Sequence, residues 1–269
     1  MAWQPLRTLG SITTRDPWAD SSAEWVVAGH EVSVHFAGIQ AVHLVDFAFH
    51  QGEILGLIGP NGAGKTTLIN ALSGFQPLTS GRVTLNGHDI TGTTPDRLGR
   101  GGITRTFQGV RTFNELTVRE NVEVAALATG QSTRQAVRRA DELLALLNLA
   151  RVERRPAETL PYGLERRLGI ARALATSPRM VMLDEPAAGL NEHESDELLA
   201  TLRALKAELG FGLLLIEHDM RLVLRLCDRL HVLDHGRTIF DGPPEMAQRN
   251  DLVLDAYLGR KAVSDADRA

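Results

Sequence analysis

The sequence predicts an α/β fold: a core of buried strands and helices, an antiparallel β subdomain and an inserted α-helical subdomain. Three observations support this prediction. Short apolar runs, typical of strands buried on both faces, recur along the chain with helical patterns between them. Segments that alternate apolar and polar residues precede the first of these runs. A long middle segment has helical periodicity and little strand signal.

Size and composition limit the possible functions. The chain has 269 residues, enough to bury a core without disulfides or structural metals. Apolar residues make up 43% and charged residues 23%, which excludes wholesale disorder. The formal net charge of −4 argues against nucleic-acid binding through overall basicity, so we expect no nucleic-acid partner. The single cysteine, Cys227, excludes a disulfide within the chain and a cysteine-rich zinc site, and it suits a reducing compartment.

The first 24 residues are expected to form a flexible N-terminal extension. They contain Trp3 and Trp18, so a small docking segment is the alternative. The extension lacks the apolar run of a signal peptide, and no apolar stretch in the chain approaches the roughly 18 residues of a membrane-spanning helix. We expect residues 25–259 to form the main domain and residues 260–269 to form a C-terminal tail.

The elements of the main domain follow in order. Apolar Val32, Val34 and Phe36 alternate with polar residues and segment 42–49 repeats the pattern, which predicts two antiparallel strands. Segment 53–58 is an apolar run that indicates a strand buried on both faces, and a helix is expected at 65–73. Further strands are expected at 82–85, 180–183, 212–216 and 229–233. Between the strands at 180–183 and 212–216, one helical stripe is formed by Leu198, Leu202, Leu205 and Leu209.

The middle of the chain, at about 109–176, is expected to be a helical subdomain. Ala136, Ala140, Leu143 and Leu147 form another helical stripe. Arginines are frequent here, and we interpret them as a solvated face rather than an anion-binding site. They are Arg134, Arg138, Arg139, Arg151, Arg154, Arg155, Arg166 and Arg167.

A phosphate-binding loop follows the buried strand and begins the next helix. Segment 59–66, Gly-Pro-Asn-Gly-Ala-Gly-Lys-Thr, fits the pattern G-x-x-x-x-G-K-[ST]. Glycines let the loop turn tightly, and backbone N–H groups with the helix dipole favour an anion. Lys65 supplies a cation to the β- and γ-phosphates, the Thr66 hydroxyl suits Mg²⁺, and Thr67 is expected near the α-phosphate. The predicted nucleotide-binding residues are Gly59, Pro60, Asn61, Gly62, Ala63, Gly64, Lys65, Thr66 and Thr67.

Two carboxylates end the strand predicted at 180–183. In a phosphate-loop ATPase, a strand-end aspartate holds Mg²⁺, and Asp184 suits this role. Glu185 is the candidate general base that polarises the attacking water. Adjacent strand residues point to opposite faces, so the two side chains are not expected to bind the metal in the same way. A further strand ends before His218, which we predict to contact the γ-phosphate.

These motifs, in this order, resemble the ATP-binding subunits of ABC transporters, over about residues 25–259. The resemblance implies a P-loop NTPase (RecA-like) core that binds ATP and Mg²⁺. It implies that Phe36 stacks on adenine and that Gln108, in Arg-Thr-Phe-Gln, joins the Mg²⁺ site to the helical subdomain. Segment 160–164, Leu-Pro-Tyr-Gly-Leu, is similar to the family's signature, so Tyr162 and Gly163 are expected to face a partner's nucleotide. Segment 188–191 resembles the loop that crosses the dimer interface.

Several segments are similar to one subfamily, the ATPases of branched-chain (hydrophobic) amino-acid importers. They include Ile-Thr-Arg-Thr-Phe-Gln, Glu-Pro-Ala-Ala-Gly-Leu-Asn, Ile-Glu-His-Asp-Met and Ala-Tyr-Leu-Gly. This resemblance implies a peripheral subunit at the cytoplasmic face of the inner or plasma membrane. Its implied partners are transmembrane permease subunits, a second ATP-binding subunit and, indirectly, an extracytoplasmic solute-binding protein. The alternatives are an ATPase of a lipid or lipopolysaccharide exporter and an ABC regulatory ATPase without a transport role.

The signature segment departs from the common Leu-Ser-Gly-Gly-Gln. Pro161 stands at the serine position and Leu164 at the glutamine position. Proline fits the first turn of a helix, but the hydroxyl that would bind the γ-phosphate is lost, at about 1.5–3 kcal/mol. We therefore expect a weaker site where this signature serves a partner, and we favour a heterodimer over a homodimer.

Overall fold

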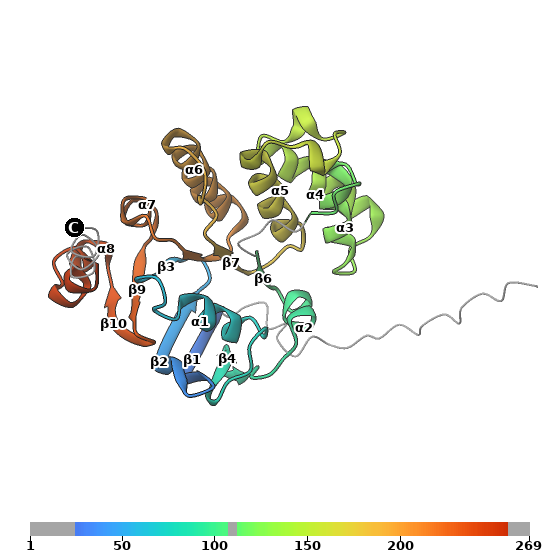
Figure 1. Ribbon diagram of the computed structural model, residues 1–269. Coiled ribbons are helices and arrows are strands. Elements are labelled where there is room, and N and C mark those ends of the chain that lie inside the picture. Colours follow the sequence, from blue (N-terminus) through green and yellow to red (C-terminus); the bar gives the residue numbers. More distant parts are fainter. Residues whose placement is uncertain (1–24, 107–111, 258–269) are drawn as a thin grey trace, which may run out of the picture.

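The computed structural model describes residues 25–106 and 112–257, and within them the strands form two sheets (Figure 1). The first is a four-stranded antiparallel sheet in the order β2-β1-β4-β5. Its strands are β1 (Val26–Phe36), β2 (Ile39–His50), β4 (Ser80–Leu85) and β5 (His88–Asp89). The expected antiparallel pair at the start of the main domain is confirmed as β1 and β2.

The second sheet has six strands in the order β10-β9-β3-β8-β7-β6. The strands from β9 to β6 are parallel, and β10 pairs antiparallel with β9 at one edge. The strands are β3 (Ile54–Ile58), β6 (Ile103–Arg105), β7 (Met180–Asp184), β8 (Gly212–Ile216), β9 (Arg229–Asp234) and β10 (Arg237–Gly242). The core strands expected from apolar runs are all present. Two were missed because β6 has only three residues and β10 contains no fully buried residue.

Alternate residues of the parallel strands belong to different hydrophobic cores. Ile54 and Ile58 pack with the helices on one face of the sheet, whereas Leu55 and Leu57 pack toward the antiparallel sheet. Every residue of β3 is buried for this reason. A strand covered on both faces needs apolar residues throughout, which explains the unbroken runs in the sequence.

Helices cover the parallel sheet and also form a separate unit that Figure 1 shows beside α6. The helical unit consists of α3 (Val118–Leu127), α4 (Thr133–Leu146) and α5 (Tyr162–Ala175), with short 3₁₀ turns at Ala150–Val152 and Ala157–Thr159. The other helices are α1 (Lys65–Leu72), α2 (Pro95–Arg100), α6 (Glu192–Leu209), α7 (Met220–Leu226) and α8 (Pro244–Ala247). None of the helices in residues 25–106 and 112–257 is long and apolar enough to span a bilayer.

The expectation of a solvated arginine face was wrong for Arg166 and Arg167, and Arg139 is also largely covered, with 15% of its side chain exposed. Arg166 and Arg167 are only 8% and 9% exposed. The Arg167 guanidinium donates to Glu197 on α6 at 2.8 Å, and Arg166 donates to the Tyr162 hydroxyl one turn earlier. Helix α5 is covered on several sides, so these positions face neighbouring chain rather than water. Arg138 and Arg154 are exposed as expected.

Candidate active site

Three neighbouring strands carry the predicted functional residues at their carboxyl ends. Strand β8 lies between β3 and β7, and Ile216 on β8 is in register with Leu57 on one side and Asp184 on the other. The phosphate loop after β3, His218 after β8 and Glu185 after β7 therefore leave the sheet at one edge. Carboxyl ends of parallel strands are the usual ligand-binding edge of open α/β sheets.

The phosphate loop needs glycine at two positions because of close backbone contacts. A Cβ at Gly59 would lie 2.1 Å from the Leu233 carbonyl oxygen, and one at Gly64 would lie 2.3 Å from that of Ala41. The loop is also held from outside, because Gly236 N–H donates to the Ala63 carbonyl at 2.9 Å. These contacts give the loop a defined shape, as convergent N–H groups require.

Tyr257 packs against the hydrophobic core near the backbone of Gly59 in the loop. Burial raises the pKa of Tyr257 to about 12. Tyr257 belongs to the Ala-Tyr-Leu-Gly segment, in which a subfamily resemblance was visible but no role of the tyrosine was predictable.

Lys65 begins α1 and reaches into the loop. It is 8% exposed, and its Nζ donates to the carbonyl oxygens of Gly59 at 2.7 Å and Pro60 at 3.0 Å. Thr66 is exposed and Thr67 half-buried in the first turn of α1, where helical N–H groups are free of intrahelical partners. A cation, a helix N-terminus and a hydroxyl thus come together, and this combination suits a nucleotide phosphate chain.

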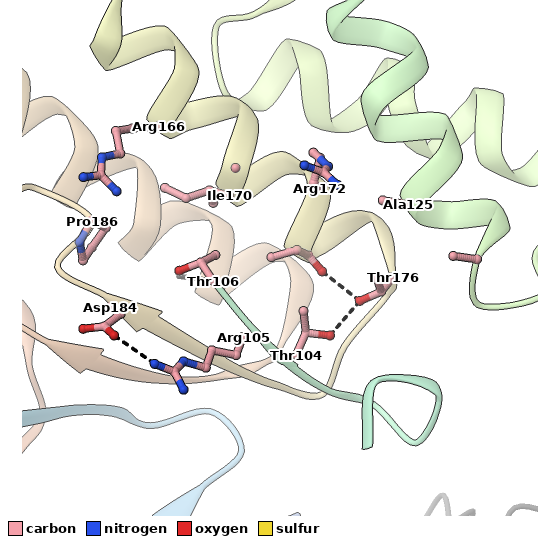
Figure 2. A pocket seen from close by; sticks show the side chains of 13 residues that line it. Thr104, Arg105, Thr106, Ala125, Arg166, Ile170, Arg172, Thr176, Asp184 and Pro186 are labelled. Atoms are coloured by element: carbon pink, nitrogen blue, oxygen red, sulfur yellow. Dashed lines mark hydrogen bonds and ion pairs between the residues drawn. The ribbon is translucent and has the colours of Figure 1, made fainter. Parts of the chain in front are cut away.

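Asp184 is paired with an arginine that the sequence analysis did not assign. Its Oδ2 accepts from Arg105 on β6 at 2.9 Å, and both side chains are nearly fully buried (Figure 2). Arg105 also contacts Asn70 and Ser73 of α1. Burial raises the pKa of Asp184, and the Arg105 guanidinium opposes this shift. The arginine stands three residues before Gln108, but only the β6–β7 pairing brings it to Asp184.

These two residues line the floor of a cavity between the helical unit and the parallel sheet. The cavity has a volume of about 330 Å³, and Arg166 and Arg172 of α5 line its opposite side, whereas Thr176 forms a hydrogen bond with Thr104 of β6 at 2.9 Å (Figure 2). Residues 107–111 lie outside the described part of the chain, so Gln108 is not placed relative to this cavity.

Glu185 and His218 form a pair at the same edge. Glu185 has a φ of +47°, a left-handed conformation that is uncommon for a residue with a side chain. Its carboxylate Oε1 lies 3.8 Å from Nδ1 of His218, which is more than half exposed. Asp184 and Glu185 therefore have different partners, an arginine for one and a histidine for the other.

The donor set fits Mg²⁺ held jointly with a nucleotide. Thr66 offers a hydroxyl and Asp184 a carboxylate, the oxygen ligands that Mg²⁺ prefers. Within the part of the chain that the structure describes, no cluster of three or more His, Cys, Asp and Glu could hold a metal by itself. The ion would therefore depend on phosphate oxygens for its remaining ligands, as Mg²⁺ commonly does.

Phe36 lies at the end of β1 and is 44% exposed. The hairpin that carries it is bound to the turn between β9 and β10, where the His43 N–H donates to the Gly236 carbonyl at 2.8 Å. The Gly236 N–H in turn donates to Ala63 of the phosphate loop. An exposed ring on a hairpin fixed to the loop is available for stacking on a base.

The signature segment lies at the start of α5, and Pro161 is the N-cap residue of this helix. Tyr162 is 45% exposed and Gly163 is half-buried. A Cβ added at Gly189 would lie only 2.9 Å from the Tyr162 ring, so the signature helix packs against the loop that follows Glu185. Pro161 and Tyr162 at the start of α5 are exposed, so a second molecule can approach this end of the helix.

The ABC transporter family model matches residues 42–188. The chain is 42% identical to the high-affinity branched-chain amino acid transport ATP-binding protein BraF of Pseudomonas aeruginosa, over 85% of this chain and 95% of BraF. It is 41% identical to LivG of Escherichia coli, which has the same description, over 84% of this chain and 94% of LivG.

Solved structures agree with this relationship. The ADP conformation of MJ1267, an ATP-binding cassette of an ABC transporter, superposes with a TM-score of 0.78 at 30% identity, over 88% of this chain and 100% of that one. The dimeric cassette MJ0796 superposes with a TM-score of 0.73 at 25% identity, over 81% and 98%. The predicted P-loop NTPase fold and the resemblance to ABC ATP-binding subunits are confirmed. This chain therefore belongs to the ABC transporter family, as an ATP-binding subunit that hydrolyses ATP.

Proposed function

We propose that this chain is the energy-coupling ATPase subunit of an importer for branched-chain or related amino acids. The observation that carries the catalytic part is the meeting of the phosphate loop, Asp184 and the Glu185–His218 pair at one sheet edge. The identity to BraF and LivG, two branched-chain amino acid transport proteins, supports the substrate class.

ATP would bind across the phosphate loop. Phe36 stacks on the adenine, the N–H groups of residues 59–67 bind the phosphates, and the Lys65 ammonium neutralises the β- and γ-phosphates. Thr66 and Asp184, with Gln108, would hold Mg²⁺, which neutralises charge on the phosphate oxygens. Arg105 donates a hydrogen bond to Oδ2 of Asp184, so Oδ1 is the oxygen that would bind the metal.

Hydrolysis would proceed by in-line attack of water on the γ-phosphate. Glu185 accepts a proton from this water, and His218, which lies against Glu185, contacts the γ-phosphate. Positioning and charge supply the catalysis, without a covalent intermediate.

A second ATP-binding subunit would complete each site. Its nucleotide would meet the exposed start of α5, with Tyr162 and Gly163, and the similar cassette MJ0796 is dimeric. Pro161 in place of a hydroxyl residue favours a heterodimer in which the partner supplies a signature with serine. Within this proposal residues 25–259 are the ATPase domain, residues 109–176 its helical subdomain, and residues 1–24 and 260–269 its flanking segments.

The remaining partners follow from the importer assignment. Two transmembrane permease subunits would hold the ATPase at the cytoplasmic face of the membrane, and an extracytoplasmic solute-binding protein would deliver the amino acid. Isolation of the complex from membranes tests this. We expect permeases and a second ATP-binding subunit, and uptake of branched-chain amino acids by the reconstituted complex. Recovery of lipid-exporter subunits, or of no membrane protein, would contradict the proposal.

The catalytic assignment is tested with Glu185→Gln. The amide has nearly the shape of the carboxylate but cannot accept the proton, so we expect hydrolysis to be lost while ATP binding is kept and ATP stabilises a dimer. Hydrolysis and binding are measured on the purified chain, with the exposed Glu245→Gln on α8 as a matched control. Wild-type hydrolysis by Glu185→Gln would remove Glu185 from its role.

A further inference from the structure

Glu217, immediately before His218, is one of the most buried ionisable side chains of the described residues. It is 1% exposed and follows the last residue of β8, at the edge that carries the phosphate loop and Glu185. Burial raises the pKa of Glu217, because removing a carboxylate from water disfavours its charged form. A buried carboxylate costs folding free energy unless its hydrogen bonds compensate, so its partners indicate its purpose.

Glu217 accepts a hydrogen bond from the backbone of the turn that carries Glu185. Oε1 accepts the N–H of Ala187 at 3.0 Å, a contact buried on both sides. One side chain therefore joins the end of β8 to the turn that follows β7.

That turn carries Glu185 at one end and meets the signature helix at the other. The Glu185 carbonyl accepts the Ala188 N–H at 3.2 Å, and the Glu185 N–H donates to Ile216 at 3.0 Å. Two residues beyond Ala187, Gly189 lies against the ring of Tyr162. The left-handed backbone of Glu185 persists only where the surroundings hold it, and the Glu217–Ala187 bond is one such restraint.

We propose that Glu217 is a positioning residue for ATP hydrolysis, which fixes the turn at Ala187 and thereby aims Glu185 at the attacking water. This inference rests on the proposed role of Glu185 as general base. Glu217 touches neither nucleotide nor water in this scheme. It acts on the orientation of Glu185, so its loss affects the chemical step and leaves binding at the phosphate loop intact.

Two substitutions test the role. Glu217→Ala removes the acceptor of the Ala187 N–H, and misplacement of a catalytic group by about 1 Å can cost roughly 100-fold in rate, so we expect kcat to fall about 10- to 100-fold. Glu217→Gln keeps one acceptor oxygen, since an amide offers only one, and kcat should fall less. The KM for ATP, and nucleotide affinity measured by binding, should stay within about twofold of wild type in both variants.

Glu53→Gln is the matched control. Glu53 is a mostly buried carboxylate just before the start of β3, where it pairs with Arg229. This end of the sheet is opposite to the end that carries the phosphate loop and Glu185. The Glu53→Gln substitution should lower the melting temperature and leave kcat unchanged. A purely structural Glu217 would behave in the same way, so the kcat ranking of wild type, Gln and Ala at constant KM separates the two roles.

The outcomes are distinct. Unchanged kcat in Glu217→Ala overturns the inference, as does an equal loss of nucleotide affinity and turnover. If Glu217→Ala does not fold, Glu217→Met decides, because it fills a similar space without an acceptor for the Ala187 N–H: a lower kcat at unchanged KM supports positioning, and a wild-type kcat overturns it. If Glu185→Gln hydrolyses ATP normally, the proposed function fails first. If Glu185→Gln is inactive while Glu217→Ala, or Glu217→Met in its place, has a wild-type kcat, only the present inference fails.

Discussion

Pro161 and Leu164 illustrate how single residues can alter a site without altering the backbone. Pro161 has φ −58° and ψ 151°, and its carbonyl accepts the N–H groups of Leu164 and Glu165, so α5 begins normally. No side chain caps the helix here. The geometry of a helix N-terminus is kept, and only a side-chain hydroxyl is missing at the point expected to meet a partner's γ-phosphate.

The double substitution Pro161→Ser with Leu164→Gln should therefore raise ATP turnover. A restored hydroxyl bond to the phosphate is worth about 1.5–3 kcal/mol, which corresponds to roughly 10-fold or more. Turnover is measured on the purified chain and on the complex isolated with its partners. The variant Pro161→Ala with Leu164→Gln is the control, because it removes the proline without adding a hydroxyl. Unchanged turnover in the serine variant would contradict the expectation that the altered signature weakens the site that it serves.

Residue roles were predictable from sequence only where a motif carries them. Lys65 and the strand-end carboxylates belong to short sequence motifs that directly follow predicted strands. Their proximity at one edge of the sheet was therefore predictable. Arg105 and Glu217 belong to no such pattern. Their partners Asp184 and Ala187 lie 79 and 30 residues away, and only the order of strands in the sheet brings them together.

At the scale of elements, three helices begin with a reciprocal cap. Thr117 with Glu120 caps α3, Ser132 with Gln135 caps α4, and Asn191 with Glu194 caps α6. In each, the capping side chain accepts an N–H of the first turn and the later side chain accepts the N–H of the capping residue. Asn191 therefore ends the loop after Glu185 by starting α6, which gives that loop a defined length.

Asn121 fixes the segment that enters the helical unit. It is fully buried, its Oδ1 accepts the Phe113 N–H at 2.9 Å, and its Nδ2 donates to the carbonyls of Phe113 and Thr117. We expect Asn121→Ala to lower the free energy of unfolding by about 2–3 kcal/mol, because it leaves buried backbone groups unpaired.

Urea unfolding followed by circular dichroism measures this loss. Val124→Ala, at a partly exposed position of the same helix, is the control and should cost less than about 1 kcal/mol. Equal losses in the two variants would show that the Asn121 bonds add nothing to stability.

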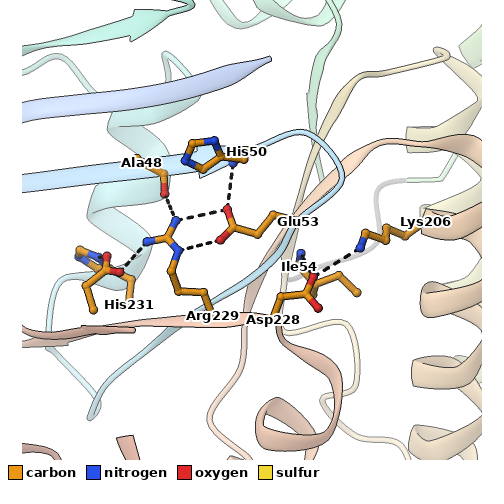
Figure 3. A network of polar contacts seen from close by, with 9 residues as sticks. Ala48, His50, Glu53, Ile54, Lys206, Asp228, Arg229 and His231 are labelled. Atoms are coloured by element: carbon orange, nitrogen blue, oxygen red, sulfur yellow. Dashed lines mark hydrogen bonds and ion pairs between the residues drawn. The ribbon is translucent and has the colours of Figure 1, made fainter. Parts of the chain in front are cut away.

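At the scale of the whole molecule, a polar network joins the two sheets (Figure 3). Arg229 on β9 donates to Glu53 at 2.7 Å, to the Ala48 carbonyl on β2 at 2.6 Å and to Asp241 on β10 at 2.6 Å. His231, which is fully buried, forms a hydrogen bond with the same Asp241 at 2.7 Å. Strands far apart in the chain are thus fixed together at the end of the sheet opposite the active site.

Asp241 should make stability depend on acid. Burial acts to raise the pKa of Asp241, but hydrogen bonds from His231 and Arg229 outweigh it and hold the pKa below its ordinary value. A depressed folded-state pKa contributes stability that is present above the unfolded value of about 3.9 and is lost as the pH falls through the folded value. Asp241→Asn should therefore be less stable than wild type at pH 7, and the difference should shrink below about pH 4.

Urea midpoints at several pH values measure this difference. The exposed Asp255→Asn is the control, for which we expect little change at any pH. A gap between Asp241→Asn and wild type that stays constant down to the lowest pH would contradict the assignment.

Cys227 offers a single probe of the whole fold, because it is the only cysteine of the chain. It is 8% exposed, and burial, with the neighbouring Asp228 carboxylate, raises the pKa of its thiol. Since the thiolate is the reactive form, a disulfide reagent should label the native protein at least about 100-fold more slowly than the urea-unfolded protein. Saturating ATP should slow labelling further, because ligand binding stabilises the folded state. Equally fast labelling with and without urea would contradict the burial of this thiol.

The sequence by itself determined the type and position of most elements, the phosphate loop, the carboxylates at the strand end and the family. These features depend on local periodicity and on short motif spacing, so residues close together in the chain are enough to specify them. Only the tertiary structure decided that Arg105 pairs with Asp184, that Glu217 holds Ala187, and that Arg166 and Arg167 are buried. Such contacts depend on strand order and helix packing, which bring together residues whose separation along the chain carries no local signal.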